Sequence, residues 1–320
     1  MVTKTLREFF NKQAHNISDH NAESLLAGYN WISNDPAKFP RLPPPTLPEG
    51  RLTLNGNEAI ALGSIAVGIK FFSFYPMTPA TSIGTALAEY AAKMEIVVEQ
   101  AEDEISAINM AVGASFTGAP SMVATSGGGF ALMTETVSLA GMTETPVVIV
   151  VAQRPGPSTG LPTRTEQGDL EFGLHSGHGE FPRAIFAPGD VEQAFHLTIK
   201  AFRIAQKYNT PVFVMTDQFL ADSYRSTRPF DLKELAPLNP CADSSIAANP
   251  HLTYRVTDSG ISPRIFPGMT SHCVKASSSS ELVIADSDEH TENGHLTEDL
   301  SVRISMVEKR LRKLDGIKSE

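Results

Sequence analysis

The chain has 320 residues, enough for one large or two ordinary domains, and its apolar (41%) and charged (19%) fractions are typical of a globular protein. Its net charge of −10 argues against a general nucleic-acid-binding protein, and two cysteines, Cys241 and Cys273, cannot build a disulfide framework or hold an Fe–S cluster. The N-terminus lacks the apolar core of a signal peptide and no apolar run reaches the ~20 residues of a membrane span, so we expect a cytoplasmic protein without a membrane partner.

The first 50 residues form a separate region of the sequence. Residues 1–35 have the pattern of one or two polar helices. A proline-rich connector follows at 39–51, where three consecutive prolines from Pro43 onward make a stiff, extended spacer. We therefore expect the main domain to begin at about residue 51.

Residues 51–231 alternate between short β-rich runs and helical patterns. The predicted strands are apolar runs at Phe71–Tyr75, Ile96–Val98, Met122–Thr125, Pro146–Ala152, Ala184–Phe186 and Pro211–Thr216. The predicted helices are 57–69, 80–93, 104–117, 130–142 and 190–208. This alternation indicates an α/β fold, a doubly wound and mostly parallel sheet with helices on both faces. The ligand crevice of such a sheet lies beyond the carboxyl ends of the strands, so the residues just after each strand are the informative ones.

The loop after the first of these strands begins with Tyr75 and Pro76 and continues to Thr78 and Pro79. The two prolines fix φ on either side of Thr78. Thr78 followed by Pro79 is also the pattern of a helix N-cap and a first helical residue. Two interpretations stay open: Thr78 caps the next helix, or a rigid backbone holds the Thr78 hydroxyl at the crevice.

Acids crowd the second crossing, at Glu99, Glu102, Asp103 and Glu104. Glu102 or Asp103 suits the capping of the helix that follows, and acids in a first turn suit its dipole. Glu104 instead shares the apolar face of that helix, with Ala107, Ile108, Ala111 and Val112. A carboxyl group on a buried face is costly unless it is paired or stays protonated, so Glu104 either forms an ion pair with an arginine or has a chemical role.

Three glycines, Gly127–Gly129, follow the third strand. The Walker pattern is absent, the dinucleotide fingerprint needs a different spacing, and Ala124 stands where a nucleophile elbow would need its first glycine. We predict a tight turn against a ligand or a partner, and not a phosphate loop.

The fourth crossing is a long loop that runs from Ala152 to about residue 180, and loops of this length in a compact α/β domain are usually functional. Arg154 stands at the carboxyl end of its strand and is a natural clamp for a carboxylate, although a surface or ion-paired arginine is the alternative. His175 and His178 are three residues apart, but without an obvious third ligand they do not indicate a metal site.

Residues 232–320 show no clear strand–helix alternation. They are mostly polar and end in a basic helical pattern from Ser301 onward, whose thin apolar content predicts packing against a domain or partner outside this chain. We expect a solvated polar loop, not a metal site, at Asp288, His290, Glu292 and His295.

Four segments, in order, resemble the α subunits of 2-oxoacid:ferredoxin oxidoreductases, most of all those of the 2-oxoglutarate (2-oxoglutarate synthase) type. The segments are GNEAIALGSIAVGIKFFSFYPMTPATS, EQAEDEISAINMAVGAS, TSGGGFALMTE and VVAQRPGPSTGLPTRTEQGDL. The likeness covers roughly residues 20–320, because LTYRVTDSGISPR, DEHTENGH and MVEKR also recur in the family. The match in order is specific for the family and much weaker for the choice of 2-oxoacid.

The resemblance implies the pyrimidine-binding half of a thiamine diphosphate enzyme. Carried over by position, the cofactor-binding residues are Glu104, Tyr75 and Pro76, with Glu104 as the catalytic acid. The substrate-binding residues are Thr78, Arg154 and Thr163. The reaction implied is the oxidative decarboxylation of a 2-oxoacid, most of all 2-oxoglutarate, to its acyl-coenzyme A, with electrons passing to ferredoxin.

The resemblance also implies a partner β subunit, which holds the diphosphate and Mg²⁺ through a Gly-Asp-Gly motif and carries the 4Fe–4S cluster. This chain has no Gly-Asp-Gly, as expected of half a site. Family members of this type have a further N-terminal domain, and residues 21–32 of this chain resemble the tail of that domain. They also continue past the equivalent of residue 320, so we expect a truncated chain. The alternatives are a non-catalytic scaffold that binds the β subunit, a pyruvate or branched-chain 2-oxoacid homologue, and a nucleotide-binding α/β protein unrelated to thiamine.

Overall fold

The structure is a computed structural model that describes residues 2–10, 15–33, 50–233, 235, 237–238, 252–264 and 283–320. Cys241 and Cys273 lie outside the described residues. The chain divides into two compact units, Met1–Glu49 and Gly50–Glu320. The described part of the first unit contains helices α1 (Val2–Phe9) and α2 (His15–Ser33), which confirm the helical pattern predicted there.

The second unit is built on a six-stranded parallel sheet with the strand order β3-β2-β4-β5-β7-β6. Its strands are β2 (Phe71–Phe74), β3 (Val97–Gln100), β4 (Ser121–Thr125), β5 (Val147–Gln153), β6 (Ala184–Phe186) and β7 (Pro211–Asp217). All six predicted strands are present, and none of their ends shifts by more than two residues. The doubly wound, mostly parallel sheet predicted from the sequence is therefore confirmed.

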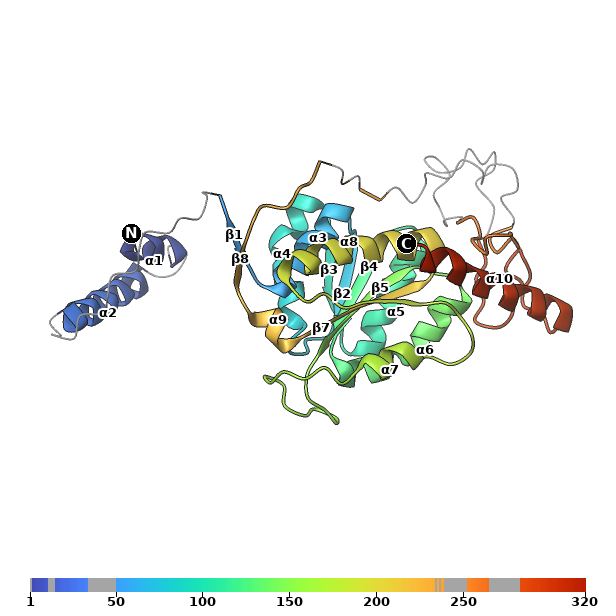
Figure 1. The fold of residues 1–320 in the computed structure, drawn as a ribbon, viewed down its shortest axis with the longest axis horizontal. Helices are drawn as coiled ribbons and strands as arrows, with labels where there is room; N and C mark the ends of the chain where they lie inside the picture. The colour runs from blue at the N-terminus through green and yellow to red at the C-terminus, as the bar shows by residue number, and fades with distance from the viewer. Residues whose placement is uncertain are drawn as a thin grey trace. The chain divides into compact units, whose positions relative to one another are not determined.

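Helices cover both faces of this sheet (Figure 1). The long ones are α3 (Gly56–Val67), α4 (Thr81–Met94), α5 (Glu104–Phe116), α6 (Gly127–Met142) and α8 (Val191–Tyr208). The short ones are α7 (Leu170–His175) and α9 (Gln218–Asp222). Two short strands, β1 (Leu52–Leu54) and β8 (Arg225–Thr227), form a separate antiparallel pair. The four short elements were not predicted, because three to six residues are too few to show a hydrophobic period.

Alternate residues of each central strand feed two separate cores. In β5, Val148 and Val150 join the core under α3, α4 and α8, whereas Ile149 and Val151 join the core under α5 and α6. Successive side chains of a strand point to opposite faces, so a strand covered on both sides must be apolar at every position. This explains why the central strands are continuous apolar runs in the sequence.

The last helix, α10 (Leu300–Lys318), packs on the same unit through charged side chains. Lys309 and Lys313 are almost fully buried, and both form ion pairs with the buried carboxylate of Glu144, which follows α6. The expectation of packing outside this chain is corrected here. An apolar count missed the contact because lysine stems can be buried when their ammonium groups are paired.

The sequence predicted a solvated polar loop before α10, and this holds only in part: Asp288 and His295 are exposed, but other residues of the segment are packed against the unit. His290 is fully buried, and its ring packs against the buried ring of Tyr254 with 4.1 Å between the ring centroids and a tilt of 51°. Glu289 binds Arg310 through two hydrogen bonds of 2.8 and 3.0 Å. The segment closes as a turn at Gly294 (φ +85), where His290 pairs with Leu296. Its polar side chains therefore hold α10 in place.

None of the helices in the described part of the chain combines the length and the apolar character that crossing a membrane requires.

Candidate active site

The candidate site lies where four adjacent strands of the sheet end. The loop 75–80 follows β2, α5 follows β3, α6 follows β4, and a long loop, 154–169, follows β5. Because β3, β2, β4 and β5 are neighbours and parallel, their carboxyl ends meet at one edge of the sheet. The sequence motifs therefore converge on one edge of the sheet, where the crevice of such a fold is expected.

The acids at the start of α5 have separate roles in the structure. Asp103 is the N-cap, and its carboxylate accepts a hydrogen bond of 2.7 Å from the backbone N–H of Ser106. Glu102 is exposed, whereas Glu104 is only 4% exposed. None of the ion pairs found among the described residues includes Glu104, so the arginine-pair interpretation of this residue is wrong. Glu104 is therefore a buried carboxyl for which the described ranges offer no counter-ion.

The three glycines are the first turn of α6, and the prediction of a tight turn ahead of the helix is wrong. Each glycine nevertheless faces a close neighbour, which belongs to this chain. A Cβ atom on Gly127 would lie 2.5 Å from the carboxylate of Asp169, and one on Gly128 would lie 3.4 Å from the carbonyl oxygen of Ser158. On Gly129 it would lie 2.7 Å from Oε1 of Glu104. The missing side chains thus make room for the long loop on one side and for Glu104 on the other.

Gly129→Ala should lower the free energy of unfolding by roughly 1–3 kcal/mol, because the added methyl group collides with Glu104 and the buried Thr125. Gly113→Ala is the matched control. Gly113 lies in α5 with nothing within 4 Å of its Cβ position, so alanine there should stabilise the protein by roughly 0.5–1 kcal/mol. Urea titrations of both variants measure this, and equal effects at the two glycines would contradict the close approach at Gly129.

The Thr78 side chain does not cap a helix. α4 begins at Thr81, its N-cap is Ala80, and no side chain caps it, so the capping interpretation of Thr78 is wrong. Thr78 is exposed at the crevice, as are Tyr75 and Pro76. The second interpretation, a fixed backbone that presents the Thr78 hydroxyl, agrees with this geometry.

Arg154 is half-buried and contacts the same loop. Its Nη1 donates a hydrogen bond of 2.6 Å to the carbonyl oxygen of Thr78. No ion pair of Arg154 is found among the described residues, so its remaining N–H groups can bind an anion. Met77, next to Thr78, connects the Thr78–Arg154 contact with Glu104. Its sulfur accepts a hydrogen bond at 3.8 Å from Thr125, and Thr125 packs on Gly129, which faces Glu104. Thr78, Arg154 and Glu104 are therefore linked by a chain of contacts at the carboxyl edge of the sheet.

Thr163 is not brought to these residues by any described contact. It is exposed on the long loop, and its carbonyl oxygen accepts a hydrogen bond of 3.2 Å from Arg164. The returning end of the loop is held instead by residues that the sequence reasoning missed. Oε1 of Gln153 accepts from the backbone N–H of Asp169 at 2.9 Å, and Gln167 donates to Asp217 at 2.6 Å.

Asp169 is a second acid, besides Glu104, that lies against the first turn of α6. Burial raises the pKa of this carboxyl, and the nearby charge of Glu166 adds to the effect. The sequence offers one signal for Asp169: it ends a long loop just before α7, a position where an aspartate ordinarily caps a helix. Its side chain turns to Gly127 instead of capping α7.

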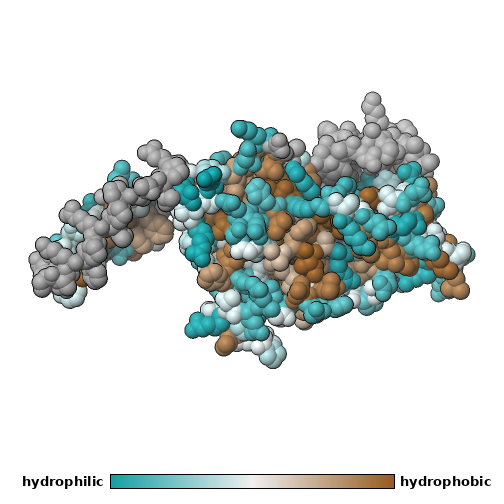
Figure 2. All heavy atoms as spheres, in the orientation of Figure 1, coloured by the Kyte–Doolittle hydropathy of each residue, from teal (hydrophilic) through white to brown (hydrophobic). Residues whose placement is uncertain are grey.

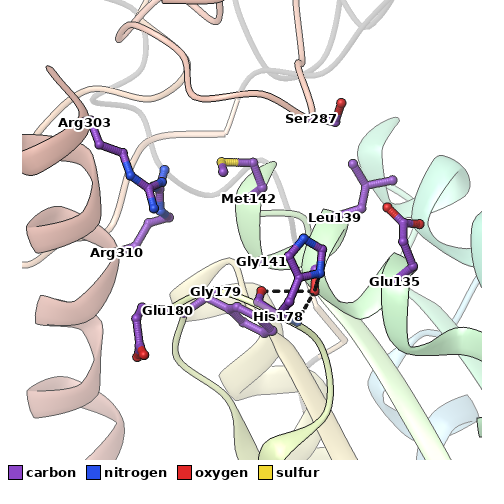
Figure 3. A pocket seen from close by; sticks show the side chains of 12 residues that line it. Glu135, Leu139, Gly141, Met142, His178, Gly179, Glu180, Ser287, Arg303 and Arg310 are labelled. Atoms are coloured by element: carbon purple, nitrogen blue, oxygen red, sulfur yellow. Dashed lines mark hydrogen bonds between the residues drawn. The ribbon is translucent and has the colours of Figure 1, made fainter. Parts of the chain in front are cut away.

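The other candidate ligands are engaged elsewhere. His175 pairs with Glu171 at 3.4 Å, and Nδ1 of His178 lies 3.1 Å from the hydroxyl of Ser138. Within the described ranges, no group of three or more potential ligands could hold a metal ion. A cavity of about 260 Å³ lies beside His178, between α6 and α10 (Figure 3). It borders the C-terminal half of α6, which points away from the carboxyl ends of the strands, so it is separate from the candidate site.

The chain is similar to several known proteins. The family model described as "pyruvate flavodoxin/ferredoxin oxidoreductase, thiamine diP-bdg" matches residues 62–309. The chain is 42% identical over 289 residues to "2-oxoacid:ferredoxin oxidoreductase 1, subunit alpha" of Sulfurisphaera tokodaii, a match that covers 86% of this chain and 44% of the relative. It is 37% identical over 241 residues to "2-oxoglutarate oxidoreductase subunit KorA" of Mycobacterium tuberculosis, covering 73% of this chain and 37% of the relative.

A solved structure is also similar. It is a 2-oxoglutarate:ferredoxin oxidoreductase from Magnetococcus marinus with 2-oxoglutarate, coenzyme A and succinyl-CoA bound. It matches with a TM-score of 0.84 and 34% sequence identity, over 99% of this chain and 54% of that chain. The chain thus spans about half the length of the relatives that it matches.

Proposed function

Because the chain belongs to the pyruvate flavodoxin/ferredoxin oxidoreductase family and contains its thiamine diphosphate-binding region, we propose that it is the α subunit of a 2-oxoacid:ferredoxin oxidoreductase. The family excludes the alternative of a nucleotide-binding protein unrelated to thiamine. The observation that carries the proposal is Glu104, a buried carboxyl at the start of α5 that has no counter-ion among the described residues. The solved relative contains 2-oxoglutarate and supports that substrate over pyruvate or a branched-chain 2-oxoacid.

The residues at the crevice fit the aminopyrimidine of thiamine diphosphate. When bound, this cofactor supplies the nucleophilic carbon that adds to the 2-oxo group. Glu104 would hold a proton at a pyrimidine ring nitrogen, which needs a carboxyl shielded from water and free of an arginine. The space left by Gly129 lets Glu104 lie against α6 while its carboxyl stays beside the crevice.

Arg154 and Thr78 would orient the substrate. One N–H of the Arg154 guanidinium is used on the Thr78 carbonyl, which leaves others for the carboxylate of the 2-oxoacid. The exposed Thr78 hydroxyl can donate to a substrate oxygen beside it. Thr163 joins this set in our proposal only if the long loop moves toward the crevice, since the described structure places it on an exposed part of that loop.

The composition of the outer surface of α5 and α6 is an argument that a partner chain covers it. Solvent-facing helices carry charges, as α8 does with Glu192, Arg203 and Lys207, but α5 and α6 contain one charged residue each. Ile105 (49% exposed) and Leu132 (52%) lie on this surface, and apolar side chains are visible on this unit in Figure 2. In our proposal the β subunit covers this surface, which begins beside Glu104, and supplies the diphosphate and Mg²⁺ site and the 4Fe–4S cluster.

Purification of the chain with its β subunit tests the function. The complex should reduce ferredoxin when given 2-oxoglutarate, coenzyme A and thiamine diphosphate, and faster than with pyruvate. The chain alone should bind thiamine diphosphate weakly, because the diphosphate site is expected on the partner. Tight binding by the chain alone would contradict the half-site proposal, and a complex that assembles without turnover would favour the scaffold alternative.

Ile105→Lys adds a control for the partner surface. It should prevent co-purification with the β subunit, because a charge would be buried at the contact. Ile304→Lys changes a similarly exposed isoleucine on α10 and should leave assembly intact. Normal assembly of Ile105→Lys would place the partner elsewhere.

A further inference from the structure

Asn57 is a fully buried polar residue in the first turn of α3. Its Nδ2 donates a hydrogen bond of 2.7 Å to the carbonyl oxygen of Pro79, in the turn that carries Thr78, and one of 2.8 Å to the hydroxyl of Ser82, in the first turn of α4. A carbonyl oxygen only accepts hydrogen bonds, so the amide nitrogen must be the atom that faces Pro79. Asn57 therefore holds this turn from the protein interior.

The helix that carries Asn57 is itself firmly placed. Asn55 and Glu58 form a capping box, with hydrogen bonds of 2.8 and 3.0 Å to each other's backbone N–H groups. Gly56 packs so closely on α9 that a Cβ atom there would lie 2.6 Å from the carbonyl oxygen of Leu220. Movement of the first turn of α3 would break both contacts, so Asn57 donates from a fixed point.

The other polar atom of the Asn57 side chain, Oδ1, helps to explain why an asparagine stands at this position. Its Oδ1 is buried and has no hydrogen-bond partner in the described part of the chain. An unsatisfied buried acceptor costs free energy, and leucine, of similar size and shape, would avoid that cost. The two donated hydrogen bonds are thus the gain that an asparagine brings to this position.

The turn is held from two sides. Asn57 binds the Pro79 carbonyl from the interior, and Arg154 binds the neighbouring Thr78 carbonyl at 2.6 Å from the crevice. The first turn of α4 has no side-chain cap of its own. The Thr78 hydroxyl belongs to the residue whose own carbonyl is the first of these two anchors, and the second anchor is the next carbonyl along the chain, so its position depends on both.

We propose that Asn57 is a positioning residue that fixes the Thr78 hydroxyl at the crevice and acts on substrate through it. This inference rests on the proposed function for its effect on substrate. The anchoring of the turn by Asn57 can be measured without any activity.

Asn57→Leu is the informative variant, because it keeps the volume, removes both donors and removes the unsatisfied Oδ1. In the complex with the β subunit, kcat/KM for 2-oxoglutarate should fall roughly tenfold or more, the equivalent of one or two hydrogen bonds. Thr78→Val should cost much less in the Asn57→Leu background than in the wild type, since the hydroxyl is already misplaced. Ser64→Ala is the control, since Ser64 is a buried polar residue of the same helix that bonds within it, to the Ala61 carbonyl at 2.7 Å.

Amide hydrogen exchange of the chain separates this inference from the proposed function. Asn57→Leu should speed exchange in the peptide that spans 77–85 and leave the sheet unchanged, whereas Ser64→Ala should not. Unchanged exchange there would overturn the inference whether or not the complex is active. In an active complex, normal kcat/KM for Asn57→Leu, or a loss that simply adds to that of Thr78→Val, would also overturn it. If exchange responds but the wild-type complex has no turnover, the anchoring stands and the proposed function fails.

Discussion

Glu104→Gln should reduce turnover of the reconstituted complex roughly 10²-fold or more, the loss expected when a proton-transfer group is removed. Glutamine keeps the shape of the side chain and fits the same space beside Gly129. It cannot gain or lose a proton at the pyrimidine ring, which is the role proposed for Glu104. The measurement is 2-oxoglutarate-dependent reduction of ferredoxin with thiamine diphosphate at saturation.

Glu102→Gln is the matched control for this experiment. Glu102 is two residues away, exposed, and removed from the apolar face of α5, so its variant should keep near-normal turnover. Urea unfolding of both variants checks that the fold is retained. Near-normal turnover of Glu104→Gln would remove Glu104 from the mechanism, and an equal loss for both variants would show a general effect of charge near the crevice.

Spacing alone predicts that Glu104 is buried. The apolar face of α5, with residues at three, four, seven and eight positions from Glu104, predicted its burial, and the structure confirms it. The central strands were predicted for a similar reason, because burial on both faces leaves a continuous apolar run. Patterns of this kind record which side of an element meets the core.

Contacts between distant segments leave no such pattern. Nothing local indicates that Gly129 faces Glu104, or that Asn57 reaches the turn of Thr78, because these pairs depend on how helices pack across a sheet. The same limit explains the errors. Thr78 before Pro79 has the local chemistry of a helix cap, but tertiary hydrogen bonds from Asn57 and Arg154 hold the turn in another conformation.

The docking of α10 is the clearest case of a contact hidden from composition. Lys309 donates hydrogen bonds to Glu144, to the carbonyl oxygen of Tyr254 at 3.0 Å and to the hydroxyl of Ser262 at 2.9 Å. Lys313 pairs with the other carboxylate oxygen of Glu144, at 2.5 Å. Both lysines and the carboxylate are buried, so their charges depend on one another.

Glu144→Gln should therefore lower the free energy of unfolding by roughly 3–5 kcal/mol, since it leaves two buried ammonium groups without a counter-ion. Glu95→Gln is a close control, because Glu95 is also a glutamate with positive φ (54°, against 49° for Glu144) and also pairs with a lysine. Its pair with Lys70 is exposed, so this variant should lose about 1 kcal/mol or less. Urea unfolding at neutral pH measures both.

The pH dependence of the difference gives a second, independent measurement. Burial alone would raise the pKa of Glu144, but the charges of Lys313 and Lys309 and their hydrogen bonds outweigh it and lower the pKa to about 2. A carboxyl whose pKa is lower in the folded state stabilises the fold above its ordinary pKa of 4.5, and this stabilisation is lost as the pH falls toward 2. The gap between wild type and Glu144→Gln should thus be widest between about pH 4.5 and 8 and close below 4.5. It should also narrow above pH 8, because burial lowers the pKa of Lys313 to about 8 and the ion pair is lost when this lysine loses its proton. A gap that does not change with pH, or an equal cost for Glu95→Gln, would show that the ion pairs do not hold α10.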